Sequence, residues 1–100
     1  MPKINLSIPH QLSQEEAKSR ISRLMAEGRT QASDRISDVV ETWTGYVATF
    51  SFRVRGFSVA GKLEVQPGQV VVDLNLPWAA LPFKGRIEEE LRQRARQLLA

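Results

Sequence analysis

The residue best suited to acid–base chemistry is His10, which stands between Pro9 and the start of a predicted helix. An imidazole can act as a general base near neutral pH when another group orients it. Glu41 is the one suggestive partner, and no serine or threonine is placed beside His10 by its position in the sequence. A lone histidine near a turn is more often a surface or hydrogen-bonded structural residue. We therefore predict no catalytic residue and no enzymatic activity.

The composition argues against metal and cofactor chemistry. Cysteine is absent, so the chain has no disulfide, thiol nucleophile or thiolate metal ligand. A zinc site with a single histidine would have to rely on carboxylates, which is unusual for zinc. We predict no metal and no cofactor. The net charge of +3 is compatible with an anionic partner but does not require one.

Basic residues gather on two predicted surfaces, the outer sheet face and the last helix. An RNA or DNA interface would add exposed aromatic rings to such charge. The aromatic residues of the same strands point inward instead, and three glutamates neutralise the helix, so we predict a solvated face and no nucleic-acid partner. Apolar residues on the outer face suggest a homodimer contact. The basic residues are Arg53, Arg55, Lys62, Arg92, Arg94 and Arg96, and the apolar ones are Val47, Ala60 and Val71.

The strongest pattern in the chain is the strict alternation of apolar and polar residues from Tyr46 to Leu76. Alternation with period two is typical of strands with one buried face. Turn signals at Arg55-Gly56 and Pro67-Gly68 divide the stretch into three strands. A slip of one residue would turn every apolar group to water, so the register is determined. The predicted pairs are Val54–Phe57, Phe52–Val59, Phe50–Gly61 and Ala48–Leu63, then Val65–Val70, Leu63–Val72 and Gly61–Leu74.

Two segments have the apolar spacing of amphipathic helices, Leu12–Gly28 and about Lys84–Leu99. Ser13 and Glu16 form a capping box at the start of the first. Gly28 is predicted to end it, which leaves Arg29–Asp34 as a connector. The second helix carries i,i+4 ion pairs, Glu88 with Arg92 and Glu90 with Arg94. A short strand, Lys3–Ile8, precedes both helices.

The strand Ile36–Trp43 has two possible registers. If Thr44-Gly45 forms a two-residue turn, Trp43 pairs with Tyr46, and Val39 and Glu41 face inward. A bulge or a longer loop instead brings Ile36, Val40 and Asp38 inward. Either register turns one carboxylate toward the apolar face unless the strand lies at a sheet edge, where charges are common. The sequence favours the edge position and leaves the register open.

These elements predict a single domain over residues 1–100 with an α+β fold. The apolar sheet face must be covered, and the two amphipathic helices are the available cover. We expect a five-stranded, mostly antiparallel sheet (β-α-β-β-β-β-α) with both helices on one face, similar in shape to a helix-grip fold. The first strand flanks either the last or the second strand, and the last is favoured.

The segment Leu76–Gly85, LPWAALPFKG, is the most apolar stretch outside the predicted helices and strands, and Pro77 and Pro82 exclude regular structure over most of it. Its Trp78, Leu81 and Phe83 form either an exposed binding surface or a plug over the open end of the core. A mixed arrangement, with Trp78 exposed and Phe83 buried, is a third possibility.

Four stretches together resemble the polyhydroxyalkanoic acid system protein family: PHQLSQEEA, the W-T-G before the alternating stretch, FSFRVRGFSVAGKLEV and LPWAALPFKGRIEEEL. The resemblance covers the whole chain and implies an association with polyhydroxyalkanoate storage granules, whose surface is apolar. It supplies no catalytic residues.

With this resemblance we expect an accessory protein that binds the granule, or a granule-associated protein, through Trp78, Leu81 and Phe83. The alternative is a protein that holds a small apolar ligand, such as a hydroxyacyl chain, between the sheet and the last helix. The N-terminus lacks the apolar run of a signal peptide, and no stretch is long enough to span a bilayer, so we expect no transmembrane segment and a cytoplasmic location, at the granule surface if the resemblance holds.

Overall fold

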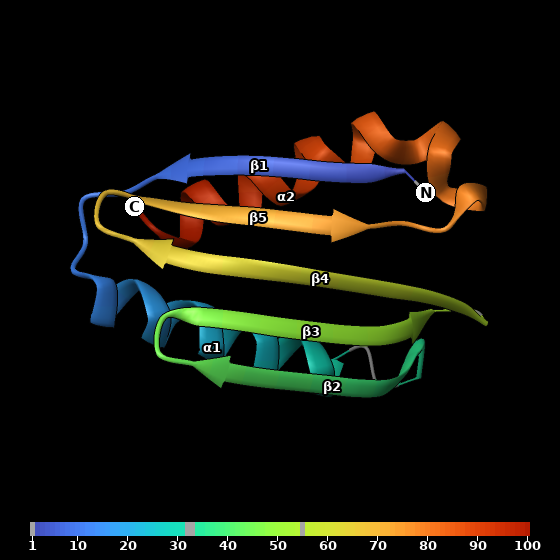
Figure 1. Cartoon of the computed structure of the whole chain (residues 1–100), viewed down its shortest axis with the longest axis horizontal. Coiled ribbons are helices and arrows are strands. Elements are labelled where there is room, and N and C mark those ends of the chain that lie inside the picture. The colour runs from blue at the N-terminus through green and yellow to red at the C-terminus, as the bar shows by residue number, and fades with distance from the viewer. Residues whose placement is uncertain (1, 32–33, 55) are drawn as a thin grey trace.

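A computed structural model describes residues 2–31, 34–54 and 56–100, which form five strands, two α-helices and one short 3-10 helix (Figure 1). In chain order the elements are β1 (Lys3–Pro9), α1 (Gln14–Gln31), β2 (Ile36–Thr44), β3 (Val47–Val54), β4 (Phe57–Gln66), β5 (Gln69–Asn75), the 3-10 helix η1 (Trp78–Phe83) and α2 (Lys84–Leu98).

The strands form one antiparallel sheet in the order β1-β5-β4-β3-β2, and both α-helices lie on the same face of it (Figure 1). The predicted α+β fold is confirmed, including the placement of the first strand beside the last. In Figure 1, α1 lies behind β2 and β3, whereas α2 lies behind β1 and β5. The helices therefore sit toward opposite edges of the sheet.

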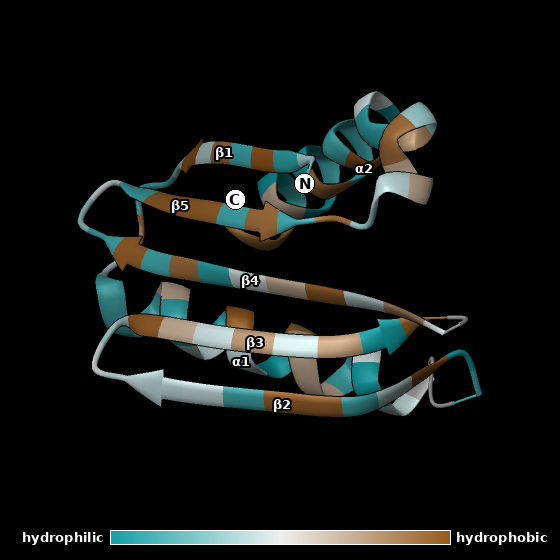
Figure 2. Ribbon diagram, turned by 45° about the vertical axis from the view of Figure 1, so that its right-hand side comes forward, coloured by the Kyte–Doolittle hydropathy of each residue, from teal (hydrophilic) through white to brown (hydrophobic). Residues whose placement is uncertain are grey.

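The alternating pattern sets the register of the central strands, and Figure 2 shows apolar and polar residues alternating along β4 and β5. All seven predicted pairs of the two hairpins are present. Gly61 lies between Phe50 on β3 and Leu74 on β5, and a Cβ at Gly61 would stand 2.6 Å from Phe50 Cζ and 2.5 Å from Leu74 Cδ2. The missing side chain at Gly61 therefore makes room for two larger ones.

The strand β2 lies at the sheet edge, as predicted, and combines features of both proposed registers. Its two-residue turn is Gly45-Tyr46, one position later than predicted, because Gly45 takes the φ of +60° that this turn requires. Trp43 therefore pairs with Ala48, not with Tyr46, and Glu41 pairs with Phe50.

A bulge interrupts β2 between Ser37 and Val40. Two residues, Asp38 and Val39, occupy the place of one, and Asp38 has a φ of +53°, which aspartate tolerates better than most residues do. Beyond the bulge Ile36 returns to register and pairs with Val54. Val40, which the second register placed inward, is exposed on the outer face.

The first helix begins at Gln14, directly after the predicted cap at Ser13 and two residues later than the predicted Leu12, and it ends later than predicted. The Ser13 hydroxyl accepts a hydrogen bond from the backbone N–H of Glu16 at 3.1 Å, which satisfies one free donor of the first turn. Gly28 does not end the helix, which continues to Gln31. Glycine within a helix costs about 1 kcal/mol relative to alanine, and such a cost does not by itself stop propagation. The predicted connector Arg29–Asp34 is therefore partly helical, and residues 32 and 33 of it lie outside the described residues.

The two helices meet at one end. Arg20 of α1 donates from Nη1 to the backbone carbonyls of Leu98, at 3.0 Å, and Ala100, at 2.9 Å, at the C-terminal end of α2. The buried apolar side chains come mostly from β1, β4, β5 and the facing residues of the helices near this junction. They are Ile4, Leu6, Ile8, Ala17, Ile21, Ala48, Leu63, Val65, Val70, Leu74, Leu76 and Leu99.

We expect Gly61→Ala to lower the free energy of unfolding by about 1–3 kcal/mol, because the new methyl group overpacks the contact between Phe50 and Leu74. Urea unfolding followed by circular dichroism measures the change. The control is Gly28→Ala, where no atom lies within 4 Å of the new Cβ and the helix should gain about 1 kcal/mol. Equal effects of the two substitutions would contradict the packing shown here.

Candidate functional site

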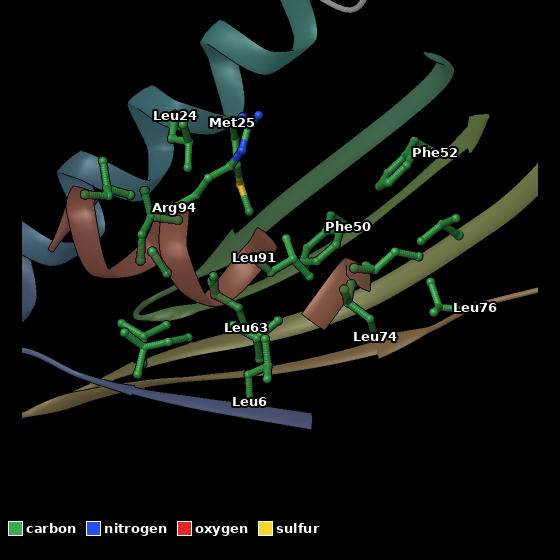
Figure 3. Close-up of a pocket in the computed structure, with 18 of the residues that line it drawn as sticks. Leu6, Leu24, Met25, Phe50, Phe52, Leu63, Leu74, Leu76, Leu91 and Arg94 are labelled. Atoms are coloured by element: carbon green, nitrogen blue, oxygen red, sulfur yellow. The ribbon is translucent and has the colours of Figure 1, made fainter. Parts of the chain in front are cut away.

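An apolar groove of about 500 Å³ runs between α1, α2 and the inner face of the sheet (Figure 3). The sheet forms its floor, and side chains of the two helices form its walls. Its lining comprises Leu6, Ile8, Ile21, Leu24, Met25, Phe50, Phe52, Val54, Phe57, Val59, Leu63, Val70, Val72, Leu74, Leu76, Pro77, Ala80, Ile87, Leu91, Arg94, Ala95, Leu98 and Leu99.

The groove exists because the helices are joined at one end and lie toward opposite edges of the sheet. Near the Arg20 contact the inward side chains are buried. Toward the β3–β4 turn the inward residues Phe52 and Val54 are only half-buried, and Phe57 is 48% exposed. Large apolar side chains on the inner face of a sheet are ordinarily covered. Their incomplete cover identifies this end of the sheet as a candidate binding surface.

Arg94 is the one charged residue among the described residues of the groove lining. Its side chain extends from α2 toward α1 (Figure 3). The predicted partner of Arg94, Glu90, instead approaches Arg86 at 3.7 Å, and Glu88 approaches Lys84 at 4.0 Å rather than the predicted Arg92. The guanidinium of Arg94 forms no ion pair with any described carboxylate.

The segment predicted to lack regular structure forms η1, which runs directly into α2. Pro77 precedes its first turn, and the Pro77 carbonyl accepts a hydrogen bond from Ala80 N at 2.9 Å. Proline is compatible with the start of a helix because the first N–H groups have no helical partner. Pro82 lies inside η1, two residues before α2 begins at Lys84. The prediction that the two prolines exclude regular structure is therefore wrong.

The large side chains of η1 point to solvent. Trp78 is 67% exposed, Leu81 48% and Phe83 57%, so neither the plug nor the mixed arrangement is observed. We call these three residues the apolar segment. Pro77 and Ala80 of the same stretch line the groove, so the apolar segment borders one end of it. In Figure 1, η1 and the β3–β4 turn lie at the same end of the sheet.

His10 is buried and structural. Its Nδ1 accepts a hydrogen bond from the backbone N–H of Leu12 at 3.1 Å, and its Nε2 lies 3.0 Å from the carbonyl oxygen of Gln66, to which it donates. Both ring nitrogens are therefore engaged in joining the β1–α1 connection to the β4–β5 turn. Glu41, the candidate partner of His10, lies on β2, at the opposite edge of the sheet from β1.

Glu41 faces the helix side of the sheet and is satisfied there. It pairs with Arg29 of α1 and accepts a hydrogen bond from Trp43 Nε1 at 2.7 Å. Lys18 of α1 lies over the rings of Trp43 and Tyr46, 5.1 and 5.7 Å from their centroids, and donates to the Gly45 carbonyl. These contacts fasten α1 to the β2–β3 hairpin, which is a structural role for the W-T-G stretch.

The outer face of the sheet is mixed in character. Glu64 pairs with both Val47 and Val71 in neighbouring strands, so the apolar residues there are separated by a charge. The homodimer contact through Val47, Ala60 and Val71 stays a prediction. Arg53 donates to the Gly56 carbonyl at 3.1 Å, and Arg55 lies outside the described residues. Within the described ranges there is no cluster of three metal-ligating side chains.

The fold and groove define a class of small α+β proteins: a five-stranded antiparallel sheet that carries two helices on one face, with an apolar groove between them. Residues 4–99 match the family described as "Putative polyhydroxyalkanoic acid system protein", and the chain belongs to this family. No match was found among curated proteins or solved structures. The family description names the polyhydroxyalkanoic acid system and no chemical reaction. Neither described helix has the length and apolar composition needed to cross a membrane.

Sequence reasoning placed the candidate ligand space between the sheet and the last helix but missed the contribution of α1. Leu24 and Met25 of α1 face Leu91 and Arg94 of α2 across the groove (Figure 3). The sequence does contain one signal for this contribution of α1. The apolar stripe of α1 continues to Met25, one turn beyond Ile21, which is the last residue of that helix that the structure buries.

We expect His10→Ala to lower the free energy of unfolding by about 2 kcal/mol, because it leaves Leu12 N and the Gln66 carbonyl without partners at a buried position. His10→Asn is the matched control, since its side-chain oxygen can take the place of Nδ1 and should recover part of the loss. Urea unfolding gives both values. A His10→Ala protein as stable as the parent would contradict the structural role.

Proposed function

We propose that this protein is a non-enzymatic accessory protein of the polyhydroxyalkanoate system that binds the granule surface, or a granule-associated protein, through the apolar segment. The observation that carries this proposal is the exposure of Trp78, Leu81 and Phe83 together on one six-residue helix. Family membership supplies the polymer system, and a polyester granule presents an apolar surface that such side chains would enter. The protein is then expected in the cytoplasm, at the granule.

The energetics favour a surface contact over a structural role for the apolar segment. Burying a large apolar side chain is worth about 2 kcal/mol relative to leaving it fully in water, and these three are about half to two-thirds exposed, so together they offer about 3 kcal/mol before the costs of association. Because η1 runs directly into α2, the side chains are held on a helical scaffold and lose less freedom on binding than those of an irregular loop.

We propose no catalytic role because the polar atoms of His10 and Glu41 are already engaged. The hydrogen-bonding atoms of the His10 ring are both occupied by backbone groups, and Glu41 is paired with Arg29. A general base needs a free nitrogen or oxygen within reach of its substrate. These two residues, which were the acid–base candidates, do not offer one.

We expect the double substitution Trp78→Ser and Phe83→Ser to lower partitioning onto isolated polyhydroxyalkanoate granules about 30-fold, which corresponds to about 2 kcal/mol of lost apolar burial. Co-sedimentation with granules measures it. The urea midpoint should not fall, because both side chains are mostly exposed.

Val40→Ser is the matched control, because Val40 is 58% exposed but lies on the outer sheet face away from the apolar segment. It should leave partitioning unchanged. Undiminished binding by the double variant would exclude the apolar segment as the binding surface.

A second candidate function is the binding of a small apolar ligand, such as a hydroxyacyl chain, in the groove. The observation that favours it is the groove itself: its volume of about 500 Å³ lies within the range of about 300–1,000 Å³ that is typical of ligand sites. A space filled by side chains would have contradicted this function.

We expect Ala95→Phe to abolish binding of the neutral apolar dye N-phenyl-1-naphthylamine, because the ring would occupy the groove that Ala95 lines. Dye fluorescence on titration measures the affinity. Ala26→Phe is the control, since Ala26 is an exposed helical alanine outside the groove lining. Equal dye binding by the two variants would show that the dye lies elsewhere.

A further inference from the structure

We propose that the ligand of the groove is a single-chain amphiphile with a carboxylate head group, whose alkyl chain lies in the groove and whose carboxylate pairs with Arg94. This proposal rests on the ligand-binding function of the groove and names the class of ligand. It is independent of the apolar segment and of granule binding.

The charge of the groove lining supports a carboxylate. Among the lining residues that the structure describes, Arg94 is the single ionic group, and its guanidinium is not engaged by a described carboxylate because Glu90 approaches Arg86. A guanidinium presents parallel N–H donors that match the two oxygens of a carboxylate. The exposed position of Arg94 on α2 lets the head group keep part of its hydration.

The apolar lining restricts where the polar atoms of the ligand can lie. Apart from Arg94, every lining residue within the described ranges is aliphatic, aromatic, methionine or proline. A hydroxyl or ester group deep in the groove would lose its hydrogen bonds to water without finding side-chain partners, at a cost of about 1–3 kcal/mol. The ligand should therefore carry all of its polar atoms at one end. A hydroxyl on carbon 3 meets this condition, because it lies next to the carboxylate end and would reach the rim with it.

The volume of the groove, about 500 Å³, lies in the range of small-ligand sites, about 300–1,000 Å³. A single alkyl chain is an apolar occupant of that size class.

A second hollow that adjoins the groove does not add a net negative charge that would repel an anionic head group. It shares Leu24 and Leu98 with the groove, and its described lining carries two acidic and two basic residues. They are Glu16, Glu27, Arg20 and Arg23.

The experiment compares decanoate with decanol on the whole chain, below the concentration at which decanoate forms micelles, by displacement of N-phenyl-1-naphthylamine. We expect decanoate to bind more tightly than decanol, and Arg94→Gln to weaken decanoate about tenfold while leaving decanol unchanged. Arg96→Gln is the matched control, an exposed arginine of the same helix outside the lining, and should change neither affinity. Arg94→Lys should retain part of the decanoate affinity, since lysine keeps the positive charge but lacks the two parallel N–H donors of the guanidinium.

The outcomes separate this proposal from the function on which it rests. If both ligands bind and Arg94→Gln weakens neither or both alike, the carboxylate proposal is overturned and the apolar groove function stands. If neither ligand displaces the dye, both are overturned. Comparable affinities for decanoate and 3-hydroxydecanoate would support the placement of polar atoms at the rim. A 3-hydroxydecanoate that binds at least tenfold more weakly would overturn that placement.

Discussion

The structure depends on how the two helices are fastened over the apolar face of the sheet. Five strands spaced about 4.8 Å apart are about 19 Å wide, and two helices packed 8–10 Å apart could cover that width. The chain therefore has enough helix to close its core. It does not close because α1 is held to the edge hairpin by Lys18 and by the pair Arg29–Glu41, whereas α2 lies over β1 and β5. Arg20 brings the helices together at one end only, and the groove is the space that remains.

The central sheet could be predicted because one physical condition applies to every residue in it. Period-two alternation from Tyr46 to Leu76, with turn signals at two places, allows a single register in which all apolar groups share a face. Gly61 opposite Phe50 follows from that register without further information. The position of β1 beside β5 was harder to predict from the sequence, because β1 could have paired with either outer strand of the group formed by β2, β3, β4 and β5.

Other features depended on contacts between segments distant in the sequence. Glu41 faces inward because Arg29, from a helix predicted to have ended at Gly28, reaches it. Because of the β2 bulge, one end of the strand places Glu41 inward, as in the first predicted register, and the other end pairs Ile36 with Val54, as in the second. The sequence left the exposure of Trp78 and Phe83 open, because apolar composition favours burial and the path of η1 that exposes them is not encoded in a local pattern. The groove likewise depends on where the two helices lie relative to each other, and the apolar pattern of one helix does not determine that placement.

The bulge in β2 has a consequence for the behaviour of many copies held close together. An open edge strand offers a row of unpaired backbone groups to which another sheet can add. At Asp38 the backbone turns to a positive φ and the regular spacing of those groups is interrupted, with a carboxylate exposed at the same place. A neighbouring molecule therefore cannot extend a continuous ladder along this edge. The density of molecules on a shared surface therefore does not turn the β2 edge into a template for a growing sheet.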